Sequence, residues 1–292
     1  MRAILAGLAA TLILAGGAMA AAAPIPKAVF TDPPADAAHP PRMEVLHIPS
    51  GGVEINGVAY LAAGAGVHPT LVLLHGLPGN EKNLDLAQAV RRAGWNAITF
   101  NYRGSWGSPG TFSFEGNLAD AKAVLAYLRD AAHAKALGVD TGRLVVAGHS
   151  MGGWVTALTA AQDHGLAGAI LISAADMGGR GASAAAKPAI AKTMATDMET
   201  LAGTSPEKMA DEVIAMSPRL SFTAEVARGL SGKPLLIVTS DDGLAPTNEK
   251  LAAAVKADGG RVEMQHIATD HSYSGKRIAL EAAVIRWLQA LK

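Results

Sequence analysis

The sequence contains no cysteine, so it can form no disulfide and offers no thiol for a lipoprotein anchor. It also lacks any long run of lysine or arginine, and its 25 basic and 25 acidic residues leave a formal net charge of zero. Nothing therefore indicates nucleic acid or an anionic surface as a partner. No internal repeat is present, so an array of small repeated units is not indicated.

The N-terminal segment 1–22 differs from the rest of the chain. Arg2 precedes an apolar stretch, and Ala18-Met19-Ala20 matches the small-x-small pattern of a signal-peptide cleavage site. An uncleaved membrane anchor is the alternative, which we disfavour because alanine and glycine make the stretch only weakly hydrophobic. We therefore expect export to a bacterial periplasm or the medium, with no stable membrane insertion after cleavage. The Pro- and Ala-rich segment 23–42 predicts an extended, poorly ordered lead-in.

Half of the 292 residues are hydrophobic, which is ample for the core of one α/β domain of roughly 250 residues. Two strand patterns separated by Ser-Gly-Gly predict an antiparallel hairpin, and strand and helix patterns then alternate over the rest of 43–292. This alternation predicts a doubly wound, mostly parallel sheet with right-handed crossovers. The strands are expected at 43–48, 53–62, 69–75, 95–101, 143–148, 167–173, 234–240 and 261–267, and the helices at 81–93, 117–131, 151–163, 247–258 and 275–291.

The segment 174–232 interrupts this rhythm, because it is much longer than one connection between two strands requires. Its pattern is helical from about 184 to 228, which predicts a small helical lid insertion. Its methionines could line an adaptable apolar pocket or could simply pack the insertion onto the core. These are Met194, Met198, Met209 and Met216.

Ser150 stands where a strand pattern runs directly into a helix pattern, within the sequence Gly-His-Ser-Met-Gly at 148–152. A G-x-S-x-G motif has a physical meaning in this context, since a tight strand-to-helix turn projects the serine hydroxyl above the sheet. Glycine is required at 148 and 152 because side chains there would collide across the turn, and Gly153 would let the helix approach the sheet closely. Ser150 is therefore the candidate nucleophile.

A serine hydroxyl needs a base to remove its proton and an acid to orient that base. Asp241 and Asp242 follow the strand predicted at 234–240, and His271 follows the strand predicted at 261–267. We favour Asp242 over Asp241 because it opens a D-x-x-x-P turn, and the other aspartate would cap the turn or bind backbone amides. His266 is a second candidate base, but its place inside a strand pattern favours His271.

Several motifs in this order resemble those of the α/β-hydrolase superfamily, and in particular its bacterial esterase, dienelactone-hydrolase-like and S9-peptidase-like members. They are HGLPG (75–79), NYRGSWGSPG (101–110), GHSMGG (148–153), SDDGLAP (240–246) and DHSYS (270–274). The resemblance covers about 43–292 and implies an α/β-hydrolase fold with a Ser-Asp-His order of catalytic residues. A serine at 150 argues against dehalogenase chemistry, and the absence of cysteine separates the chain from true dienelactone hydrolases.

The resemblance also implies two backbone N–H donors for an oxyanion, those of Met151 and Leu77, whereas Pro78 has no N–H to donate. We expect a serine hydrolase, a carboxylesterase, that cleaves a small-molecule acyl substrate through an acyl-enzyme, with no metal and no organic cofactor. A serine peptidase of the same fold and a non-catalytic binding protein are the alternatives.

Other residues near these motifs are expected to have structural roles. Arg103 should brace the loops rather than contact substrate, and His149 should be structural rather than catalytic. Asp120 should support the N-terminal turn of its helix. Three aromatic residues could form the floor of a pocket or could pack in the core: Trp106, Phe112 and Phe114.

Overall fold

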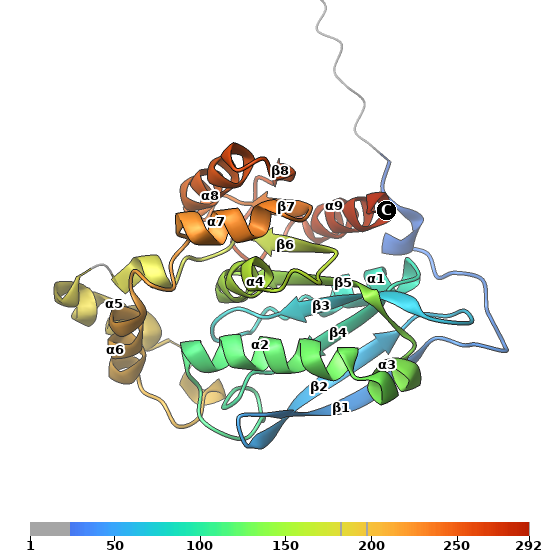
Figure 1. The fold of residues 1–292 in the computed structure, drawn as a ribbon, viewed down its shortest axis with the longest axis horizontal. Helices are drawn as coiled ribbons and strands as arrows, with labels where there is room; N and C mark the ends of the chain where they lie inside the picture. The colour runs from blue at the N-terminus through green and yellow to red at the C-terminus, as the bar shows by residue number, and fades with distance from the viewer. Residues whose placement is uncertain (1–23, 182, 197, 292) are drawn as a thin grey trace, which may run out of the picture.

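A computed structural model describes residues 24–181, 183–196 and 198–291, so the predicted signal peptide at 1–22 lies outside the described residues. Eight strands form one sheet in the order β1-β2-β4-β3-β5-β6-β7-β8 (Figure 1). The first two strands pair antiparallel with each other, β2 pairs antiparallel with β4, and every other neighbouring pair is parallel. The strands are β1 (Arg42–Ser50), β2 (Val53–Leu61), β3 (His68–Leu74), β4 (Asn96–Phe100), β5 (Val139–His149), β6 (Gly168–Ile172), β7 (Leu235–Thr239) and β8 (Val262–His266).

The helices cover both faces of this sheet (Figure 1). Leu71 and Leu73 of β3 belong to the hydrophobic cluster formed with α1 (Leu84–Arg92) and α9 (Arg277–Ala290). The alternate residues of the same strand, Val72 and Leu74, pack on the opposite face. That face is covered by α2 (Phe114–Arg129), α3 (Ala131–Leu137), α4 (Met151–Gln162), α7 (Ala224–Ser231) and α8 (Ala245–Ala257).

Burial on both faces explains the apolar runs in the sequence. Every residue of β4, β6 and β7 is buried. Strands of this kind read as continuous hydrophobic stretches, because the crossover helices leave neither face in water. The predicted doubly wound, mostly parallel α/β sheet is confirmed.

The segment between β6 and α7 forms a cap beside the C-terminal ends of the strands (Figure 1). It contains α5 (Lys187–Met194) and α6 (Pro206–Met216), together with short 3₁₀ turns. By contrast, α7 packs against α4 and α8 and so belongs to the helical layer of the main domain. Both predicted uses of the cap methionines occur, since Met194 borders a cavity while Met209 and Met216 are fully buried in the core.

The lead-in differs from the extended, poorly ordered segment that its composition suggests. Residues Lys27–Val29 form a 3₁₀ turn, and Val29 is buried against Ala89 of α1 and Ile285 of α9. The Arg92 side chain fastens this turn by donating to the carbonyl oxygens of Ala28 and Val29 at 2.6 and 2.9 Å. One apolar side chain and one arginine therefore hold the turn on the domain.

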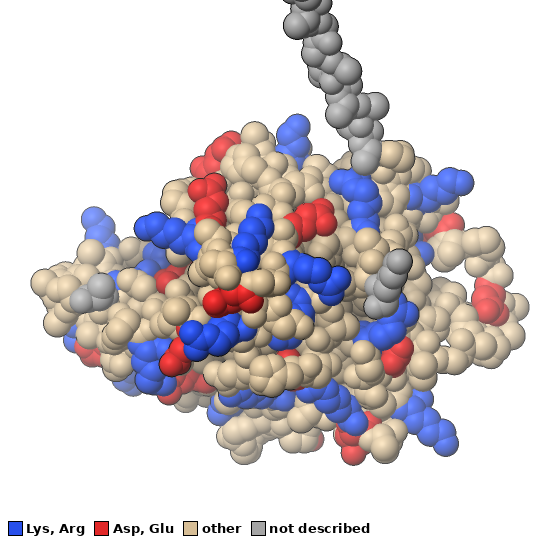
Figure 2. Space-filling model, turned by 45° about the horizontal axis from the view of Figure 1, so that its top comes forward, with Lys and Arg blue, Asp and Glu red and all other residues tan. Residues whose placement is uncertain are grey.

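The described surface carries charges of both signs. Figure 2 shows lysine and arginine interspersed with aspartate and glutamate over the face in view, as the net charge of zero leads one to expect. None of the helices that the structure describes combines the length and the apolar character needed to cross a membrane.

Candidate active site

Ser150 occupies the turn between β5 and α4. Its backbone has φ 57° and ψ −121°, a conformation that costs a residue with a Cβ on the order of 1–3 kcal/mol. The turn is held on both sides, because Ser150 N donates to Ile172 O at 2.9 Å and Ala175 N donates to Ser150 O at 3.0 Å. Strain at this one residue is thus maintained by the ordered strand and loop around it.

The glycines around Ser150 allow the backbone segments to approach closely. A Cβ at Gly148 would lie 2.0 Å from Gly152 O, and a Cβ at Gly152 would lie 2.1 Å from Leu74 O. A Cβ at Gly153 would lie 2.5 Å from the Cβ of Ala174, where α4 packs on the loop after β6. All three glycines are therefore required sterically, for the reasons that the sequence suggested.

Asp242 and His271 lie together, although 29 residues separate them in the chain. His271 Nδ1 and Asp242 Oδ2 are 2.7 Å apart, and the Asp242 side chain is 5% exposed against 40% for His271. Burial by itself would raise the pKa of Asp242, but hydrogen bonds from His271, the Leu244 amide and two serine hydroxyls hold it below its ordinary value. Asp242 is therefore a buried, ionised acceptor, and it leaves Nε2 of His271 as the nitrogen available for chemistry.

Asp241 holds a different histidine. Its Oδ1 lies 3.0 Å from Nε2 of His266, and both side chains are at least half exposed. The other ring nitrogen of His266 lies 3.0 Å from Thr239 Oγ1. The partner of Asp241 is thus His266 rather than His271. The turn-capping role considered for Asp241 belongs to Asp242, whose Oδ1 accepts the Leu244 N–H at 2.9 Å.

Three contacts fix the loop that carries His271. His149 is buried and its Nε2 lies 2.8 Å from His271 O, so this nitrogen is the donor, and the two rings lie with centroids 4.6 Å apart. Arg277 Nη1 donates to Ser272 O at 3.0 Å, and the side chain of Tyr273 is fully buried. Burial lowers the pKa of His149 to about 4, so its ring is neutral near pH 7 and serves as a structural support.

Sequence reasoning missed Ser173, which lies directly behind Asp242. Its hydroxyl lies 3.0 Å from Ser240 Oγ and 2.9 Å from Tyr273 Oη, and it is one of the groups that lower the pKa of Asp242. The side chain is buried, and its φ of 43° is unusual for a residue other than glycine. A signal was available, because Ser173 directly follows β6 at the same edge of the sheet as the other candidate residues.

The loop after β3 places Leu77 beside the nucleophile. A Cβ at Gly76 would lie only 3.0 Å from the Cβ of Ser150, so this loop and the nucleophile turn touch. Trp106 supports the loop from outside by donating from Nε1 to Pro78 O at 2.7 Å.

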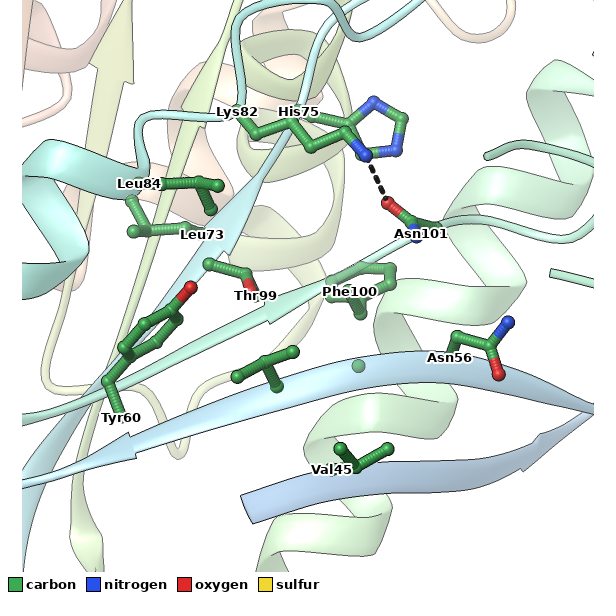
Figure 3. A pocket seen from close by; sticks show the side chains of 12 residues that line it. Val45, Asn56, Tyr60, Leu73, His75, Lys82, Leu84, Thr99, Phe100 and Asn101 are labelled. Carbon is green, nitrogen blue, oxygen red and sulfur yellow. Dashed lines mark hydrogen bonds between the residues drawn. The ribbon is translucent and has the colours of Figure 1, made fainter. Parts of the chain in front are cut away.

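Figure 3 shows a separate pocket lined mainly by residues of β2, β3 and β4, where Lys82 donates to Asn101 Oδ1 at 3.0 Å. The same ammonium lies 4.0 Å from the centroid of the Trp106 ring. Trp106 therefore supports the loop rather than forming a pocket floor, and the Lys82 ammonium stacks on its ring. His75 is buried near Lys82, and burial lowers the pKa of His75 to about 4.

A cavity of about 260 Å³ opens at Ser150 between the main domain and the cap. Leu77, Pro78 and Met151 border it on the side of the main domain, so both residues predicted to donate to an oxyanion meet Ser150 at one cavity. The remaining lining comes from the loop after β6 and from the cap: Ala175, Met177, Arg180, Thr193, Met194, Thr196 and Leu201. It is predominantly apolar, with one charged side chain.

Arg103 braces the loops, as expected. Its partner is Asp120, and the role predicted for Asp120 is wrong. Asp120 is fully buried and accepts hydrogen bonds from Arg103 N and Nε at 2.8 and 2.6 Å and from Ser50 Oγ at 2.5 Å. It does not support the first turn of its helix, because α2 begins at Phe114 with Ser113 as its cap. Phe112 and Phe114 are core residues, each less than 3% exposed.

The fold and this strand–serine–helix turn define a class of protein, an α/β hydrolase with a capped cavity at the serine. The model of the alpha/beta hydrolase family matches residues 71–279, which is most of the chain. The chain therefore belongs to the alpha/beta hydrolase family. No curated protein matches it.

Solved structures share the fold at low sequence identity. An esterase from Pyrobaculum calidifontis is 22% identical with a TM-score of 0.66, and the match covers 88% of each chain. The carboxylesterase EstE1 from a metagenomic library is 24% identical with a TM-score of 0.63, covering 91% of this chain and 92% of the other. Pyrococcus horikoshii acylaminoacyl peptidase is 16% identical with a TM-score of 0.59, covering 87% of this chain but 42% of the peptidase.

Proposed function

We propose that this protein is a serine hydrolase that cleaves carboxylic esters through an acyl-enzyme intermediate. The observation that carries the proposal is the buried Asp242 bonded to His271, at the same edge of the sheet as the strained Ser150 turn. Ser150 Oγ attacks the ester carbonyl while His271 Nε2 takes its proton. Asp242 keeps the imidazole in the tautomer whose Nε2 is free to accept that proton.

The oxyanion of the tetrahedral intermediate would be stabilised by the N–H groups of Leu77 and Met151. Two such donors in a cavity that is mostly apolar are worth several kcal/mol of barrier lowering, since one donor typically contributes about 3–4 kcal/mol. His271 then returns its proton to the leaving alcohol. Water, activated by the same histidine, finally hydrolyses the acyl-enzyme and releases a carboxylic acid.

Labelling with a fluorophosphonate probe tests the nucleophile directly. We expect the wild type to be labelled and to hydrolyse short-chain esters, and Ser150→Ala to lose both properties. Ser231→Ala is the matched control, because Ser231 is the last residue of α7 and its hydroxyl donates to Arg228 O in its own helix. Equal labelling of wild type and Ser150→Ala would refute the assignment, and a folded wild type that resists labelling would favour a binding protein.

A panel of substrates separates an esterase from a peptidase. Esters of graded acyl length and N-acyl peptide amides are compared at the same pH, and kcat/KM should be measurable for the esters only. Turnover of the peptides at comparable kcat/KM would instead support the peptidase alternative.

We further propose that residues 1–22 direct export and are removed. Mass spectrometry of the N-terminus of the protein secreted from a bacterial host tests this, with a start near residue 21–24 expected. An intact Met1 on membrane-bound protein would support the anchor instead.

A further inference from the structure

Arg180 is the one charged side chain that borders the cavity at Ser150, among the residues that the structure describes. Its neighbours in the lining are mostly apolar, including Met177, Met194 and Leu201. Arg180 is an exposed residue at the edge of this lining, so its guanidinium is accessible to a ligand, and a guanidinium binds carboxylates in a bidentate geometry. The position of Arg180 therefore suggests a negatively charged group on the substrate.

The backbone that carries Arg180 packs closely on other segments of the cap. Arg180 lies in the 3₁₀ turn Gly178–Gly181. A Cβ at Gly178 would lie 2.3 Å from the carbonyl carbon of Leu220, and one at Gly181 would lie 2.2 Å from Val213 O. The two glycines let the turn pack directly on neighbouring backbone, which positions the backbone of Arg180.

No described carboxylate forms an ion pair with Arg180. Asp176, on the same loop, is the acidic residue that interacts with it electrostatically, but both of its oxygens already accept backbone N–H groups. Oδ1 accepts from Gly179 at 3.0 Å and Oδ2 accepts from Phe222 at 3.1 Å. Asp176 thus serves to close the loop, and the Arg180 guanidinium retains donors for a ligand.

The lining also indicates which half of an ester the cavity holds. It contains Ser150, Leu77 and Met151, the groups proposed to act on the carbonyl, whereas His271 is not among the described lining residues. In the proposed reaction His271 protonates the leaving alcohol, so the alcohol departs on the histidine side. The acyl group then extends into the cavity toward Arg180.

Resting on the proposed ester hydrolysis, we propose that Arg180 determines specificity by binding a carboxylate at the far end of the acyl group. The substrate class is then a half-ester of a short dicarboxylic acid, with its neutral ester carbonyl at Ser150 and its free carboxylate on the guanidinium. Hydrolysis consumes one water, and it releases an alcohol, a dicarboxylate and one proton.

Matched substrates test this directly. Monoethyl esters of succinic, glutaric and adipic acid are compared with the corresponding neutral half-amide esters, which have nearly the same size and shape. The wild type should favour the best acid over its amide by about 10- to 100-fold in kcat/KM, the range expected for a charge-assisted hydrogen bond. Arg180→Gln should lose most of this preference, chiefly through KM for the acid, because kcat/KM falls much more for the acid ester than for the neutral ester.

Two further variants sharpen the test. Lys192→Gln removes a positive charge from α5 at a residue outside the cavity lining, so it should retain the preference. Arg180→Lys should retain only part of the preference for the acid, because an ammonium cannot form the bidentate contact. Equal preference in wild type, Arg180→Gln and Lys192→Gln would overturn the role of Arg180, and so would a wild type without any preference for the acid.

A binding measurement keeps this result separate from the proposed reaction. Glutarate should bind to wild-type protein and to Ser150→Ala in calorimetry, and at least tenfold more weakly to Arg180→Gln. If glutarate binds in this way but no ester is hydrolysed, the proposed reaction fails and the anion site stands. If neutral esters are hydrolysed while glutarate binds equally to wild type and Arg180→Gln, the anion site fails and the proposed reaction stands.

Discussion

Asp241 and Asp242 are consecutive residues of one turn, and each holds a histidine supplied by β8 or by the loop that follows it. The geometry of the two pairs is similar, with N–O distances of 3.0 and 2.7 Å. Their surroundings differ, because Asp241 is 60% exposed while Asp242 is 5% exposed and accepts further hydrogen bonds. Two aspartate–histidine pairs of similar geometry therefore differ in their surroundings, since water competes for one carboxylate and fixed donors surround the other.

The largest expected effect comes from exchanging each aspartate for asparagine. Asp242→Asn should lower kcat for a good ester by about 10³- to 10⁴-fold, because an amide no longer holds His271 in the required tautomer. Asp241→Asn should change kcat by less than about threefold. Steady-state kinetics measure both, with circular dichroism to verify folding. Comparable losses in the two variants would show that burial does not distinguish the pairs.

The sequence alone located the strand ends but could not choose between these aspartates with certainty. Residues 241 and 242 both follow a clear apolar strand, and consecutive side chains at such a position point in different directions. Which of them is buried depends on Ser173, Ser240 and Tyr273, which arrive from three different segments. The choice is therefore set by packing between distant segments, which no local pattern records.

The same limit applies to Asp120. It was predicted to support the start of its helix, yet the helix starts earlier because Ser113 accepts the Gly116 N–H and caps it. Arg103 and Ser50 then reach Asp120 from other loops. The strands were accessible from periodicity, whereas the partners of buried charges were not.

The second prediction concerns the hydroxyl groups next to each aspartate–histidine pair. Ser173→Ala removes a donor from Asp242 and should lower kcat about fivefold, the equivalent of about 1 kcal/mol for one hydrogen bond, with little change in KM. It should also raise the pKa of Asp242, since one of the groups that lower it is removed. Thr239→Val is the matched control, because Thr239 Oγ1 contacts His266 in the exposed pair. A kcat loss in Thr239→Val equal to that in Ser173→Ala would contradict this expectation.

The third prediction is a dependence of stability on pH. The pKa of Asp242 is lowered in the folded protein, so its ionised form contributes stability at pH values above the ordinary value of 3.8. That contribution is lost as the pH falls through the lower folded value. The difference in free energy of unfolding between wild type and Asp242→Asn should therefore be larger at pH 6 than at pH 3. Urea denaturation at several pH values measures it, and a difference that grows toward pH 3 would be inconsistent with the sign of the shift.

The smallest effect is expected for the exposed pair itself. His266→Gln should change the free energy of unfolding by less than about 1 kcal/mol, because both side chains of this pair are at least half exposed. A double-mutant cycle with Asp241→Asn isolates the coupling between the two side chains from their separate interactions with neighbours. We expect that coupling to lie below about 1 kcal/mol, and kcat for ester hydrolysis to stay within about threefold of wild type in all three variants. A much larger coupling would mean that the exposed pair is as strongly organised as the buried one, and that solvent exposure is not what separates Asp241 from Asp242.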